Sequence, residues 1–197
     1  MDFTGRQIYD TAVRCDGEVA GVVRDLLLNT MNWSVAYIVV EVGAWPSPRR
    51  ILLEPAQVSA FVSETRSLDV SLSVRDLEAC PLEQTHPPAS QQFAVRIAGP
   101  PPAALHWADA LIPPDGAQRC PDLESARAIR GYAASCGDSR QRVVGLRIHT
   151  PDDRFCPVVA AIVVGGLWNW RRTREIPACA VTEVNAEMRR ISIAGNS

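Results

Sequence analysis

The chain has 197 residues, of which 47% are hydrophobic, and its 20 basic residues nearly balance its 22 acidic ones. This length fits one large domain or two small ones, and the apolar content is enough for a globular core. The near-neutral charge excludes a general nucleic-acid coat and an acidic tail. Because none of the basic residues is Lys, a Schiff-base lysine and a phosphate-loop lysine are excluded as well.

The N-terminal sequence does not have the basic segment and following apolar stretch that mark a signal peptide. The longest apolar runs, 35–40 and 158–164, are shorter than the roughly 20 residues that span a bilayer. We therefore expect a cytoplasmic protein that does not insert into membranes.

The first half is predicted to consist of short strands. Asp16-Gly17 is a hairpin-turn signal because Gly tolerates positive φ, and the β-branched run 33–42 is the strongest strand signal. Ser73 is expected to cap a helical turn over 73–78. The predicted strands of this half are 11–15, 19–28, 33–42, 50–53, 58–62 and 68–72.

Composition changes between the halves, since 9 of the 15 prolines fall in residues 81–121. Proline fixes φ and cannot donate to a strand ladder, so this segment is predicted to be an extended connector. It also contains apolar residues such as Phe93 and Trp107, and we therefore expect it to lie along the flanking domains. The predicted domains are 1–80, the connector 81–121, and 122–197.

The second half is predicted to repeat the first. Its expected strands are 132–135, 142–149, 156–164, 174–176, 180–183 and 189–193. An ordered series of matches indicates a duplication. The matched positions are Ile8 with Ile129, Cys15 with Cys136, Val22-Val23 with Val143-Val144, Ile38 with Ala161, Gly43 with Gly166, Trp45 with Trp168, Arg49-Arg50 with Arg171-Arg172, and Pro55 with Pro177.

The first half resembles the PRC-barrel family. The hairpin around Asp16-Gly17, the run 37–53 and the closing segment 69–78 carry this resemblance, which is weaker over 122–194. It implies a mainly β protein of two small antiparallel PRC-type β-barrels in tandem, joined by the Pro-rich connector. The family is named for the cytoplasmic domain of the photosynthetic reaction-centre H subunit, and a related barrel occurs in a ribosome-maturation factor. These relatives imply an assembly or docking role.

The strongest local cluster of candidate binding residues combines Trp with Arg. Such pairs anchor protein partners or stack on bases and contact phosphates, whereas the structural alternative is a loop whose Trp folds over the barrel end. The candidate residues are Trp168, Trp170, Arg171, Arg172 and Arg174, together with Trp45, Arg49 and Arg50 in the first half.

Catalytic and metal-binding signatures do not stand out. There is no GxSxG, HExxH or Gly-rich phosphate loop, and the three His are scattered. Free thiols are expected for the six Cys, with a disulfide or a metal site as alternatives. The acidic group Asp16, Glu18 and Asp25 fits turn chemistry or, alternatively, cation binding or proton movement.

We therefore predict a non-catalytic protein-binding or assembly module without a cofactor. The alternative is an RNA- or ribosome-associated factor that uses the Arg/Trp cluster of the second barrel. The runs 35–40 and 158–164 do not alternate apolar and polar residues, so both faces of these strands need cover. The cover is expected from the other half, from the connector or from a homodimer contact.

Overall fold

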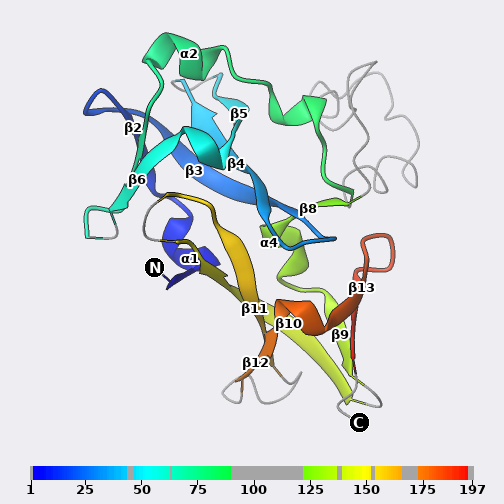
Figure 1. Ribbon diagram of the computed structural model, residues 1–197. Helices are drawn as coiled ribbons and strands as arrows, with labels where there is room; N and C mark the ends of the chain where they lie inside the picture. The colour runs from blue at the N-terminus through cyan, green and yellow to red at the C-terminus, as the bar shows by residue number, and fades with distance from the viewer. Residues whose placement is uncertain are drawn as a thin grey trace, which may run out of the picture.

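The computed structural model describes residues 2–43, 47–62, 64–89, 122–136, 139–151, 154–165 and 173–194. Their fold is mainly β and contains two seven-stranded sheets (Figure 1). None of the helices in the described ranges is long and apolar enough to cross a membrane.

The predicted strands of the first half are confirmed, with boundaries that differ by a few residues. Asp16 and Gly17 form the predicted turn with φ of 50° and 85°, and the Ser73 hydroxyl accepts a hydrogen bond from the Asp76 amide at 3.2 Å. The elements are β1 (Asp2–Thr4), α1 (Gly5–Ile8), β2 (Ala12–Cys15), β3 (Glu18–Asn29), β4 (Val35–Val42), β5 (Arg49–Leu53), η1 (Pro55–Gln57), β6 (Val58–Val62), β7 (Ser67–Val70), α2 (Val74–Glu78) and η2 (Glu83–Thr85).

The second half repeats the order of the first from β1 to β7, as a duplication requires. Its elements are β8 (Leu123–Ser125), α4 (Ala126–Ile129), β9 (Ala133–Cys136), β10 (Ser139–His149), β11 (Val158–Gly165), β12 (Thr173–Pro177), η4 (Ala178–Ala180), β13 (Val181–Asn185) and β14 (Arg190–Ile193).

The strand order is β5-β4-β3-β2-β7-β6 in one sheet and β12-β11-β10-β9-β14-β13 in the other. Within the described residues the outer strands of each sheet do not pair with each other, so closed barrels are not confirmed. The prediction of purely antiparallel sheets is wrong, because β2–β7 and β9–β14 are parallel pairs. A parallel pair needs a long connection between its strands. Strands β3 to β6 form this connection between β2 and β7, and strands β10 to β13 form it between β9 and β14.

Strand register corrects the alignment of the two halves. The β3–β4 and β10–β11 ladders carry bulges at corresponding points, and matching these bulges aligns Leu26 with Leu146. Their partners across the ladder then align Ile38 with Ile162, one residue away from the predicted match to Ala161. The connections before β4 and β11 differ in length, spanning residues 30–34 and 150–157, and sequence matching does not place such a length difference to the residue.

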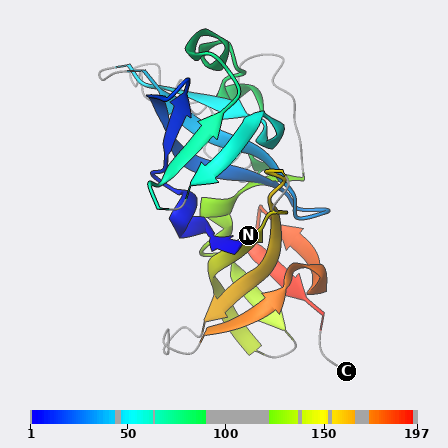
Figure 2. The ribbon, with the colours of Figure 1, turned by 60° about the vertical axis from the view of Figure 1, so that its left-hand side comes forward.

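The two halves exchange their first strands. We call residues 2–8 (β1 and α1) the first arm and residues 123–129 (β8 and α4) the second arm. Strand β1 pairs with β10 of the second half, with Phe3 opposite Ile148. Reciprocally, β8 pairs with β3 of the first half, with Glu124 opposite Leu28. Figure 2 shows the N-terminus beside the second half, below the rest of its own half.

A bridge between β4 and β11 lies at the centre of this arrangement. Ser34 pairs with Val158 in an antiparallel bridge, and the two are equivalent positions in the repeat. The hydrogen bonds on either side of the bridge are also equivalent in the repeat. The Val35 amide donates to the Pro157 carbonyl at 2.9 Å, and the Val159 amide donates to the Trp33 carbonyl at 2.7 Å. The halves are therefore related by an approximate two-fold axis through this bridge.

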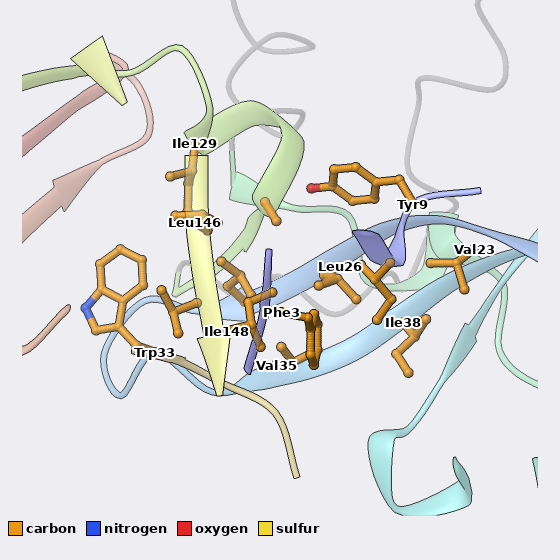
Figure 3. Close-up of a cluster of buried hydrophobic side chains, with 14 of the residues drawn as sticks. Phe3, Tyr9, Val23, Leu26, Trp33, Val35, Ile38, Ile129, Leu146 and Ile148 are labelled. Atoms are coloured by element: carbon orange, nitrogen blue, oxygen red, sulfur yellow. The ribbon is translucent and has the colours of Figure 1, made fainter. Parts of the chain in front are cut away.

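One apolar core runs through both halves. Figure 3 shows Phe3 of the first arm among side chains of β3, β4 and β10, including Val35, Leu26 and Ile148. A smaller cluster covers the outer face of the first sheet, where Val39 is fully buried with Leu123 of the second arm. The prediction that this central strand is covered on both faces is thus confirmed, and the second half supplies part of the cover.

Candidate partner-binding surface

The predicted binding residues fall into two separate places. Arg49 and Arg50 lie on β5, whereas Arg174 lies on β12. Both views place these strands at opposite ends of the molecule (Figures 1 and 2). The other predicted residues lie outside the described residues: Trp45, Trp168, Trp170, Arg171 and Arg172.

A strip of alternating charges crosses the outer face of the first sheet. Arg24 on β3 contacts Asp10 at 2.6 Å and donates to Glu41 on β4 at 2.7 and 3.1 Å. Arg50 on β5 then lies 3.6 Å from Glu41 and 3.6 Å from Glu83. We call these five residues the charged strip; they come from five separate segments that the fold brings together.

The two ends of the charged strip differ electrostatically. The hydrogen bond from Arg24 lowers the pKa of Glu41 and raises that of Arg24 itself, because each charge favours the other. Burial raises the pKa of Glu83, and the nearby Asp25 charge adds to this shift while Arg50 opposes it. Arg24 and Glu41 therefore stabilise each other's charge as an ion pair. At the other end of the strip, Arg50 offsets only part of the cost of burying the charged form of Glu83.

The remaining cations on the two edge strands face solvent. Arg49 is exposed and has no ion pair within the described residues. Arg174 is likewise exposed on β12, where the neighbouring Glu175 pairs with Arg147 on β10 at 3.1 Å. Neither arginine makes an ion pair with another described residue, so a ligand can approach either one without breaking such a pair.

Asp25 is a junction residue that the sequence did not identify as such. Its carboxylate accepts hydrogen bonds from the Ser125 hydroxyl and from the Arg127 amide, at the start of α4 in the second arm. Burial raises its pKa despite these bonds. Asp16 and Glu18 stay exposed in the hairpin, so the three acidic residues do not form one site.

A fully buried carboxyl group lies in the second arm. Glu124 is 1% exposed, and its oxygens accept hydrogen bonds from the Ser125 amide at 2.7 Å and from the Tyr132 hydroxyl at 3.1 Å. The equivalent residue of the first arm is Phe3, which packs on Phe61 with ring centroids 5.2 Å apart. Both donors to Glu124 belong to the second half, so these bonds hold Glu124 within its own half, whereas Phe3 contacts its own half through Phe61 and the second half through Phe155.

The described residues contain no group of three or more His, Cys, Asp or Glu that could hold a metal ion. Four cysteines in the described ranges are free thiols: Cys15, Cys80, Cys156 and Cys179. Burial raises the pKa of the Cys15 thiol, which keeps it protonated and poorly nucleophilic.

In comparisons with known proteins, no family model matches the chain, and no curated protein matches it.

Proposed function

We propose that the protein is a non-catalytic protein-binding or assembly module built from two copies of a PRC-barrel-like unit. The observation that carries this proposal is the setting of Arg50. Its side chain is 52% exposed and lies between Glu41 and Glu83, next to the exposed Arg49 on the same edge strand.

An arginine held in this way suits a protein interface. Arg is enriched among the residues that dominate binding energy. A guanidinium already positioned by two carboxylates loses less side-chain freedom when a partner binds. The neighbouring Arg49 adds a cation that no ion pair within the described residues neutralises.

The charged strip also favours protein over nucleic acid at this end of the molecule. It contains three carboxylates and two guanidinium groups. Phosphate binding gains its affinity from uncompensated cations, and Asp10, Glu41 and Glu83 would repel a phosphate backbone. A protein surface of mixed charge can match such an alternating pattern.

The resemblance to PRC-barrel domains supports an assembly role, because the relatives named above act in assembly. The shared strand order of the two halves supports a duplicated unit. Since a fold alone does not determine function, the binding proposal rests on the arginines of β5.

The alternative function, an RNA- or ribosome-associated factor, is favoured by the charge of the second half. Residues 120–197 contain 11 Arg and 8 Asp or Glu, a net charge of +3, whereas residues 1–80 contain 7 and 11, a net charge of −4. The exposed Arg174 belongs to the basic half.

An affinity purification with matched variants separates the two functions. Tagged wild-type protein, Arg49→Glu and the control Arg75→Glu, which changes an exposed arginine of α2, are each incubated with extract of the source cells. A protein retained by wild type and control, lost with Arg49→Glu and unaffected by nuclease supports the proposal. Retention that nuclease abolishes and that weakens steeply with salt supports the RNA alternative. Equal retention by all three proteins contradicts a role for β5.

A further inference from the structure

Neither half of the protein completes its sheet alone. The first arm supplies a strand to β10, and the second arm supplies a strand to β3. Each seven-stranded sheet thus takes six strands from one half and its seventh from the other. This is the arrangement of a strand-exchanged dimer, formed here between two parts of one chain.

The contacts between the halves obey the approximate two-fold axis. The Ser34–Val158 bridge pairs equivalent residues, and each arm pairs with the same region of the opposite long strand. An interface in which the same surface of each unit meets the other is the type that closes a symmetric dimer.

The interface between the halves is both apolar and specific. Phe3 is 3% exposed and stacks on Phe155 of the second half at 6.4 Å. Leu123 is 5% exposed and packs in the outer cluster of the first sheet. The guanidinium of Arg127 in the second arm lies 4.5 Å from the ring centroid of Tyr9, which directly follows the first arm, and adds a contact between the halves. Interfaces with such apolar centres are typical of permanent dimers.

We propose that two copies of this chain bind each other by exchanging halves, so that the first half of one copy pairs with the second half of the other. The contacts described above all lie outside residues 90–121. Because the halves belong to one chain, each half meets its own partner half at a raised effective concentration, on the order of millimolar for linked modules. A half from a second copy carries the same arm and the same acceptor strand, and it makes the same contacts.

The test uses the whole chain with a specific protease site inserted within residues 90–121. Isotopically light and heavy preparations are cut, unfolded in urea, mixed, refolded and examined by native mass spectrometry. The two halves are expected to remain together after cutting, and light and heavy halves are expected to pair in all combinations in equal amounts. Halves that separate at micromolar concentration overturn the proposal.

The uncut chain provides the second readout. Light and heavy chains refolded together at about 1 mM, near the effective concentration of the tethered partner, are expected to yield a dimer with one chain of each kind. Refolding at about 1 µM is expected to yield monomers, because the tethered half then outcompetes the second copy. Only monomers at both concentrations would overturn the exchange between copies.

Matched variants link both readouts to the arms. Phe3→Asp and Leu123→Asp each place a charge in a buried arm position, and each is expected to weaken association of the cut halves at least about 100-fold. Val19→Asp is the control, since Val19 is 66% exposed in the β2–β3 hairpin, and it is expected to leave association unchanged. Equal association of all three cut variants contradicts the assignment of the interface.

Discussion

Replacing Phe3 by Ala tests the exchange of the first arm through stability alone. Phe3 is 3% exposed, and its ring lies 5.2 Å from that of Phe61 and 6.4 Å from that of Phe155. Truncating a buried Phe to Ala destabilises proteins by about 3–5 kcal/mol. Because β1 has only three residues and its site can partly collapse, we expect a loss of about 3 kcal/mol in the free energy of unfolding.

Urea unfolding followed by circular dichroism measures this loss, with an unchanged slope against urea as the sign that the folded state is the same. Val19→Ala is the matched control, because Val19 is 66% exposed, and it should change stability by less than about 0.5 kcal/mol. A double-mutant cycle with Phe155→Ala, which changes the aromatic partner in the second half, should give a coupling energy of about 0.5–1.5 kcal/mol, the size of an aromatic pair. A loss below about 1 kcal/mol for Phe3→Ala would show that the first arm is not docked as described.

Three further predictions concern buried groups. Tyr132→Phe should destabilise the fold by about 1–3 kcal/mol in urea unfolding, because it removes a donor to the Glu124 carboxyl; unchanged stability would contradict this role. Burial raises the pKa of Asp25, so the folded protein binds this proton at higher pH than the unfolded chain does, and stability falls as pH rises through the folded pKa. Asp25→Asn should remove that fall, so the free energy of unfolding of the variant minus that of wild type should increase between about pH 4 and pH 8. A difference that does not change with pH would refute the raised pKa of Asp25. Val39→Asp should cost about 3–5 kcal/mol because Val39 is fully buried in the outer cluster, whereas Val19→Asp should be nearly neutral by thermal unfolding.

The candidate surface was only partly predictable from the sequence. Arg49 and Arg50 stand out in the sequence as a basic pair, and in the structure both are exposed on β5. Their environment was not predictable, since Glu41 and Glu83 reach Arg50 from other segments of the chain. The candidate binding residues also included Arg174, which the fold places on β12 at the opposite end of the molecule from β5 (Figures 1 and 2).

Local signals in the sequence determined the strands, the Asp16-Gly17 turn and the Ser73 cap, because each of these depends on residues close together in the chain. The ordered matches between the two halves indicated the duplication. Only the tertiary structure decided the two arm exchanges, the parallel pairs and the one-residue shift of the repeat. Strands of three residues such as β1 and β8 are too short to show a periodic pattern. Their partners are chosen by which sheet edge is free and which core accepts Phe3 or Glu124, and both depend on contacts between residues a hundred or more positions apart.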